Sequence, residues 1–271
     1  MYNSISSLDA IVKTISTTGT LPVETLHKII FCSFAKAGLA IHGATSKQET
    51  ELEKLIQTIP APQRGLVNGK LYLNALGFVK SFNTFLEKAD ESVILKEANI
   101  HYILDFLKER VGKVGAIVVL DCGSIPEIVT IASKSNALNR NTTIFNEAFI
   151  NPVGVTAFVT GQMSSFGREA FLRQYAQLLK ETLKAKFYVK SSTIDLTTHQ
   201  QGVTIGNFLS SLEIQKVFDQ INHFAKQNSV LITSDHGYDV VADEHGLYIT
   251  HGYRRECPLN FSKIALFLVV D

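Results

Sequence analysis

The sequence predicts an α/β protein with a mostly parallel sheet and flanking helices, preceded by a helical N-terminal region. Two observations predict this class. Up to about residue 110, apolar residues recur at near-helical spacing. After the glycines at positions 112 and 115, short runs rich in Val, Ile and Phe alternate with helical segments, as the strands and crossover helices of a parallel sheet do. We therefore expect a helical region over residues 1–110 and an α/β domain over residues 111–271.

Helices are expected in the first region at residues 21–43, 46–59, 71–86 and 89–110. Residues 46–49 have the form of a capping box ahead of the second of these helices. Pro60 and Pro62 must end that helix, because proline lacks the backbone N–H that would continue it. The phenylalanine-rich stripes of these helices favour a packed core over a ligand site.

The second region begins with a buried strand at residues 116–120, a compact apolar and β-branched run. Further strands are expected at residues 186–189, 229–233 and 264–270, helices at 127–135, 168–184 and 209–227, and a loop between the segments 148–150 and 155–159. The alternation of the two kinds of element predicts that the strands share one sheet with helices on its faces.

The composition is that of an ordinary globular protein, 45% hydrophobic and 19% charged over 271 residues. The net charge of +1 provides no overall field for nucleic acid or anionic membranes, so any phosphate recognition has to be local. Cys32, Cys122 and Cys257 lack CxxC spacing, which argues against disulfides or a thiolate zinc site and favours the cytoplasm. No apolar run reaches the roughly 18 residues of a membrane span, and no signal-peptide pattern opens the chain, so we expect neither a membrane protein nor a secreted one.

Polar side chains follow three of the expected strands at the point where each strand ends. They are Asp121 after the first strand, Asp195 and His199 after strand 186–189, and Asp235 and His236 after strand 229–233, with His251 a short way downstream. Because parallel strands present their carboxyl ends at one edge of a sheet, we expect these side chains to meet there.

Mixed sets of carboxylates and imidazoles form three-ligand metal shells that leave a position for water or substrate. Such ligands suit Zn, Mn or Fe. Each residue taken singly also has an ordinary structural explanation, since Asp caps helices, His is often a surface or core residue, and Asp-His-Gly at 235–237 forms turns. Their joint placement at one edge favours a metal site.

These motifs resemble those of the alkaline phosphatase superfamily, and within it those of the PglZ domain most. The resemblance rests on VVLDCG at 118–123, NPVGVT at 151–156, ITSDHGY at 232–238 and THG at 250–252. It implies that Asp121, Thr156, Asp235 and His236 hold one metal ion, and that Asp195, His199 and His251 hold a second. The expected ions are Zn²⁺, with Mn²⁺ as the alternative.

The resemblance also implies a function. Thr156 would be the nucleophile of a two-metal phosphohydrolase, forming a phospho-threonine that water then hydrolyses. The expected substrate is a phosphate ester, and the PglZ likeness alone favours a phosphodiesterase acting on nucleotides or oligonucleotides over a monoesterase. The helical region is consistent with the helical segment that often accompanies PglZ domains. A second hypothesis, from another class, is a metal-binding regulatory or interaction module whose helical half docks a protein partner and whose hydrolase site is vestigial.

The chain departs from the superfamily pattern, since it lacks the insertions and caps of full-length relatives and an expected arginine. Many relatives carry an Arg shortly after the first Asp, but here Asp121 is followed by Cys-Gly-Ser-Ile-Pro. Arg168, Arg254 and Arg255 are the candidates for holding the phosphate oxygens, with a helix-surface role as the alternative for the first and a solvated loop role for the others. The sulfatase motif Cys-x-Pro-x-Arg is absent.

Thr156 competes with other hydroxyls in the same region, namely Thr142, Thr143, Thr160, Ser164 and Ser165. The preceding loop favours Thr156, because Pro152 fixes φ while Gly154 permits a sharp turn that aims the next residues at the sheet edge. The start of a helix there would also present free N–H groups to a phosphoryl group. His-Gly occurs at both 245–246 and 251–252, and we expect His245 and His223 to be solvated.

Overall fold

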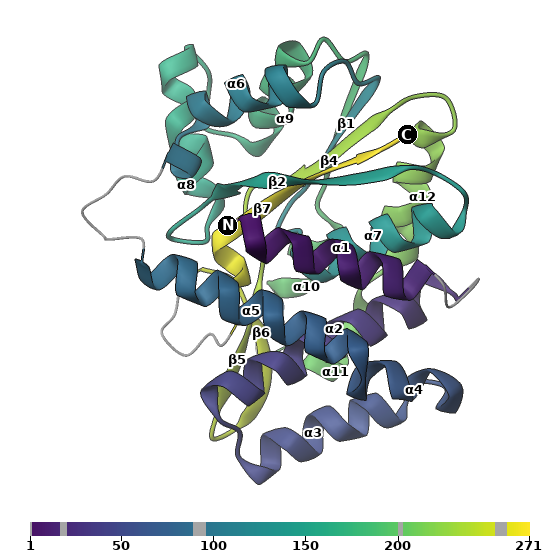
Figure 1. Cartoon of the computed structure of the whole chain (residues 1–271). Coiled ribbons are helices and arrows are strands. Elements are labelled where there is room, and N and C mark those ends of the chain that lie inside the picture. Colours follow the sequence, from purple (N-terminus) through teal and green to yellow (C-terminus); the bar gives the residue numbers. More distant parts are fainter. Residues whose placement is uncertain (1, 17–20, 89–95, 200–202, 253–258) are drawn as a thin grey trace.

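The computed structural model describes residues 2–16, 21–88, 96–199, 203–252 and 259–271. These residues form a five-stranded sheet in the order β2-β7-β4-β1-β3 (Figure 1). Its strands are β1 (Ala116–Leu120), β2 (Thr142–Ile150), β3 (Phe187–Ser191), β4 (Val230–Ser234) and β7 (Ile264–Val270). Strand β1 pairs in parallel with β3 and β4, whereas β7 pairs antiparallel with β4 and β2. The α/β class is confirmed, and the sheet is mixed.

The reversed direction of β7 follows from the connection that precedes it. After β4 the chain forms the hairpin of β5 (Asp239–Asp243) and β6 (Gly246–Thr250) and then the short 3₁₀ helix η3 (Phe261–Lys263). It re-enters the sheet at Ile264, which pairs with Ile150 at the carboxyl end of β2. A parallel strand would have required a crossover to the opposite edge. Because the chain leaves and returns at the same edge, β7 has to run antiparallel to β4.

Helices cover both faces of the sheet (Figure 1). One face packs against α7 (Ile125–Ala137), α12 (Ile214–Ala225) and the N-terminal helix α1 (Tyr2–Ser16), and α2 (Val23–His42) packs on α7 and α12. The other face packs against α6 (Ile100–Arg110), α8 (Thr156–Gly161), the 3₁₀ helix η2 (Gln162–Phe166) and α9 (Leu172–Thr182). Along β1 the side chains alternate between the two cores, with Val118 in the first and Val119 in the second. Burial on both faces explains the continuous apolar runs in the sequence.

The N-terminal helices are part of these cores. Helix α5 (Lys70–Lys88) packs on α1 and α2, which pack on α7, while α3 (Ser46–Gln57) and α4 (Ala61–Asn68) lie against α2. Helix α6 lies on the opposite side of the sheet, beside α9. Residues on both sides of position 110 therefore share the same buried clusters, and no separate core ends there among the described residues.

Several element boundaries differ from the expected ones. The capping box is formed by Thr45 and Gln48, one residue earlier, because Thr45 is the residue in the extended conformation that precedes the helix. The helix expected at 209–227 is two helices, α11 (Ile205–Ser211) and α12, separated where Leu212 turns extended. The helix expected at 168–184 begins at Leu172. In the segment 89–110, residues 89–95 lie outside the described residues, and η1 (Lys96–Ala98) precedes α6.

The helices in the described part of the chain include none that is long and apolar enough to cross a membrane.

Candidate metal centre

The first group of candidate ligands is buried at the carboxyl edge of the sheet. Asp121 directly follows β1, and Asp235 and His236 directly follow β4. Because Leu120 and Ser234 are paired in the parallel β1–β4 ladder, the residues that follow them emerge side by side. One ligand-capable atom from each of the three side chains lies within 4.8 Å of the others.

Backbone groups orient this first group. Cys122 adopts a positive φ of 63°, and its N–H donates to Asp235 Oδ1 at 3.3 Å. The other oxygen, Asp235 Oδ2, is buried and accepts no hydrogen bond, although His236 Nε2 lies 3.4 Å away. His236 Nδ1 lies 2.8 Å from the Gly237 carbonyl oxygen, which can only accept, so Nδ1 carries the proton. In the neutral ring the lone pair then belongs to Nε2, the atom that faces the site.

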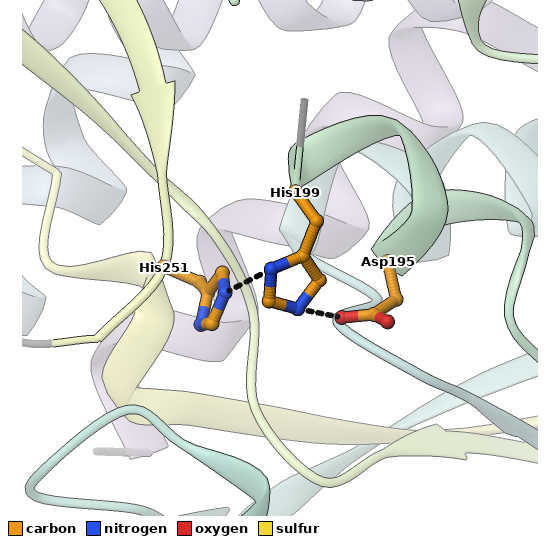
Figure 2. A group of neighbouring side chains, drawn as sticks. All are labelled: Asp195, His199 and His251. Carbon is orange, nitrogen blue, oxygen red and sulfur yellow. Dashed lines mark hydrogen bonds and ion pairs between the residues drawn. The ribbon is translucent and has the colours of Figure 1, made fainter. Parts of the chain in front are cut away.

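The second group lies closer to solvent and combines two segments (Figure 2). Asp195 belongs to α10 (Thr193–Thr198), His199 caps the carboxyl end of that helix, and His251 follows β6. His199 Nε2 lies 3.1 Å from Asp195 Oδ1, and its Nδ1 lies 3.4 Å from His251 Nε2. The remaining ring nitrogen, His251 Nδ1, is buried without a hydrogen-bond partner. The Ile249 N–H donates to the Val203 carbonyl oxygen at 2.9 Å, which holds β6 beside Val203.

The electrostatics of both groups favour a bound cation. Burial raises the pKa of the Asp121 carboxyl, and the neighbouring Asp235 raises it further, while the Lys190 ammonium opposes both. Burial lowers the pKa of the His251 imidazole, and His236 and His199 lower it further, which favours the neutral form that binds metals. Two buried polar atoms without hydrogen bonds and a mixed oxygen and nitrogen donor set fit two divalent ions of the zinc or manganese kind.

The two groups adjoin each other, and Thr156 lies beside them. The rings of His236, from the first group, and His251, from the second, stack with centroids 5.6 Å apart. Thr156 is the first residue of α8, and its Oγ1 lies 3.2 Å from His236 Nε2. Helix α8 has only six residues, so it provides less of a helix-terminal anion site than the sequence suggested. The seven residues singled out in the sequence are thus brought to one place.

The loop before Thr156 is held by a side chain that sequence reasoning treated only as part of a turn. Asn151 is fully buried; its Nδ2 donates to the Val155 carbonyl oxygen at 2.8 Å and to the Asp235 carbonyl oxygen at 3.1 Å. Its Oδ1 accepts from the Gly154 N–H at 2.8 Å. Gly154 has a φ of 62°, as the expected sharp turn requires, and a Cβ there would meet Ser262 at 2.8 Å. Asn151 therefore ties the Thr156 loop to the backbone of a candidate ligand.

The N-terminal region holds the hairpin that carries His251. In α3, Gln48 Nε2 donates to the Asp243 carbonyl oxygen at 2.7 Å, and Glu51 Oε2 accepts from the Leu247 N–H at 2.8 Å. These contacts fix the outer end of the β5–β6 hairpin, whose inner end places His251 in the second group. The helical region is thus structurally connected to the candidate site.

A second connection between the N-terminal region and the site is a buried polar network around Glu127 of α7. His27 Nε2 of α2 lies 2.6 Å from Glu127 Oε1, and the Tyr238 hydroxyl donates to the same oxygen at 2.7 Å. The Ser124 N–H donates to Oε2 at 3.0 Å. Burial, together with Glu127, raises the pKa of Tyr238 well above its usual value, so it remains a donor. The network anchors the loop that begins with Asp235.

Removal of the Glu127 carboxylate is expected to destabilise the protein strongly. Glu127→Ala leaves the donors of His27, Tyr238 and Ser124 buried without an acceptor, which should lower the free energy of unfolding by about 3–5 kcal/mol. Urea denaturation measures this loss. Asp105→Ala is the matched control, because it removes a carboxylate from an exposed pair with Lys108 and should cost at most about 1 kcal/mol. Equal, small effects of both substitutions would show that the network contributes little.

Lys190 was not predicted from the sequence, where only arginines were considered as cations for the phosphate oxygens. Its Nζ lies 2.6 Å from Asp121 Oδ2. Of the arginines that were considered, Arg168 pairs with Glu181, while Arg254 and Arg255 lie outside the described residues. The sequence did contain one indication of its place, because Lys190 directly follows the expected strand 186–189 and so belongs near the carboxyl edge of the sheet.

The residues that compete with Thr156 and His251 have other partners. Four of the five competing hydroxyl groups form hydrogen bonds outside the ligand groups: Thr142 to Asn136, Thr160 to the Thr156 carbonyl oxygen, Ser164 to that of Gly161 and Ser165 to that of Gln162. His245 is exposed at the hairpin end and lies 3.5 Å from Glu244, and His223 is exposed on α12. The structure thus separates His251 from His245, although both precede a glycine.

Comparison of the sequence with models of known protein families gives no match, and a search of curated proteins finds no significantly similar sequence. The function therefore has to be argued from the site itself.

Proposed function

We propose that the chain is a two-metal phosphohydrolase with an alkaline-phosphatase-like fold of the PglZ kind, and that it cleaves phosphodiesters of nucleotides or oligonucleotides. One observation carries the proposal: the Thr156 hydroxyl lies beside two adjoining three-ligand groups, 3.2 Å from His236 Nε2. The preference for diesters rests on the likeness of the four motifs to PglZ domains.

The ligand sets divide by their geometry. Asp121, Asp235 and His236, with Thr156, would hold one ion, and Asp195, His199 and His251 would hold the other. Two such ions would lower the pKa of a hydroxyl, polarise a phosphoryl oxygen and stabilise the leaving oxygen of an in-line displacement. Zinc is the preferred ion and manganese the alternative, because each set mixes nitrogen with oxygen donors rather than offering oxygen alone.

The residues of the chain then act as nucleophile and positioning groups. Attack by Thr156 Oγ1 on phosphorus forms an Oγ–P bond as the bond from phosphorus to the leaving oxygen breaks. Water then cleaves the Oγ–P bond, which restores the hydroxyl and releases a phosphate monoester when the substrate is a diester. Asn151 and Gly154 hold the loop that aims Oγ1, so the hydroxyl is positioned before substrate binds.

Metal content and hydrolysis test the proposal together. Purified protein saturated with zinc and dialysed should contain two zinc ions per chain by elemental analysis, and magnesium should compete poorly. It should hydrolyse bis(4-nitrophenyl) phosphate faster than 4-nitrophenyl phosphate. One ion or none in folded protein would count against the paired site. Zinc binding without hydrolysis of either ester would favour a regulatory metal-binding module instead.

A further inference from the structure

We propose that Lys190 is the cation that binds a non-bridging phosphate oxygen, in place of the arginine that the sequence lacks after Asp121. The inference rests on the proposed function and extends it to the part of the site that contacts the substrate. Its basis is the 2.6 Å contact between Lys190 Nζ and Asp121 Oδ2, which brings an ammonium group to the edge of the first ligand group.

The sheet register places Lys190 on the side of the sheet where Thr156 lies. Lys190 pairs with Val119 in the parallel β1–β3 ladder, so the two side chains point to the same face. Val119 belongs to the core that is shared with α8 and α9, and Thr156 begins α8. The cation and the candidate nucleophile therefore lie on the same face, at the carboxyl edge of the sheet.

The Lys190 side chain is partly exposed to solvent. Strand β3 is one of the two edge strands of the sheet, and the Lys190 side chain is 32% exposed, whereas the Asp121 side chain beside it is 7% exposed. A ligand that arrives from solvent can therefore meet the Lys190 side chain while the Asp121 carboxylate stays largely covered. A lysine in this position binds as a mobile point charge on a flexible stem, so it can follow a phosphoryl group.

The charge of the completed site supports this role. Three carboxylates do not fully offset two divalent ions, which leaves one formal positive charge, and Lys190 increases the excess to two. Such an excess suits an anionic phosphate group but is unfavourable without one. A lysine that served only as a counter-ion for Asp121 would be superfluous once a metal ion is bound to the same carboxylate.

The test compares phosphate binding and zinc content in two variants. In the zinc-loaded protein, Lys190→Met should weaken the binding of inorganic phosphate, measured by calorimetry, by about 10–100-fold, the usual value of a hydrogen bond to a charged group. The zinc content should stay at the wild-type level. Lys190→Arg keeps the positive charge and should retain most of the affinity. The value of kcat/KM for bis(4-nitrophenyl) phosphate should follow the same order.

Lys186→Met is the matched control, because Lys186 is exposed just before the amino end of β3, so its replacement removes the same charge away from the site. It should leave phosphate affinity unchanged. Unchanged phosphate affinity in Lys190→Met would overturn the inference, as would a wild-type protein that binds no phosphate. If Lys190→Met binds zinc more tightly with the same phosphate affinity, Lys190 is only a counter-ion for Asp121. Lys190-dependent phosphate binding by a wild type that cleaves no ester would support the subsite and contradict the hydrolase.

Discussion

Thr156→Ala is expected to abolish nearly all hydrolysis, with turnover at least about 1,000-fold below wild type, because it removes the attacking atom while the other three ligands of the first ion remain. Asp121, Asp235 and His236 do not depend on Thr156 for their position, since the sheet and the backbone N–H of Cys122 orient them. Thr156→Ser keeps the hydroxyl and should therefore retain measurable activity.

The measurement is steady-state hydrolysis of bis(4-nitrophenyl) phosphate by each purified variant, with zinc content determined on the same samples. Ser165→Ala is the control, since Ser165 is an exposed hydroxyl in the same region that donates to the Gln162 carbonyl oxygen. Its activity should remain within a few-fold of wild type. Near-normal hydrolysis by zinc-loaded Thr156→Ala would refute the assignment and leave water as the attacking group.

The strands that were predicted most accurately are those whose side chains are buried on both faces. Strand β1 and strand β7 match the expected ranges to the residue, because a continuous apolar run has one compatible environment in a sheet covered on both sides. The direction of β7 could not be predicted in the same way. An apolar run carries no information about direction, which here depends on where the preceding hairpin returns the chain.

Helix α1 and the β5–β6 hairpin are among the elements that were not predicted, because their own sequences carry weak signals. Helix α1 contains several serines, which have modest helix propensity, and its packing against α5 and α7 stabilises it. The β5–β6 hairpin has only five residues per strand and a turn at Glu244 and His245 without the Asn-Gly or Asp-Gly pair that would indicate it. Both elements depend on tertiary contacts that a local pattern does not reveal.

In the candidate site too, some residues could be placed from the local sequence and others only from contacts between distant segments. Asp121, Asp235 and His236 could be placed from the sequence, because a polar residue directly after a buried strand has a predictable location, whereas Thr156 was expected only from the family resemblance. The roles of Lys190 and Asn151 were not accessible. The first depends on which strand lies next to β1, and the second depends on a loop that folds back onto the backbone of Asp235. Contacts between segments far apart in sequence determine both.

The partition of the two ions gives the second large expected effect. His251→Ala should remove one zinc ion per chain and leave the other, because His251 lies with Asp195 and His199, while Asp235 and His236 form the other set. The loss of zinc affinity at the affected site should exceed ~10–100-fold, which is the loss that follows when a residue hydrogen-bonded to a metal ligand is removed. Asp235→Asn should remove the other ion, since Oδ2 is the buried oxygen left without a hydrogen-bond partner.

Zinc titration by calorimetry with elemental analysis distinguishes the two sites, and His245→Ala is the control. His245 also precedes a glycine in the same hairpin, but it is exposed and lies beside Glu244, so its loss should leave both ions in place. Simultaneous loss of both ions in folded His251→Ala would contradict two separable sets. The two sets are expected to stay separable although the His236 and His251 rings are in contact. The sheet positions the first set, whereas the β5–β6 hairpin, which is hydrogen-bonded to α3, positions His251 in the second.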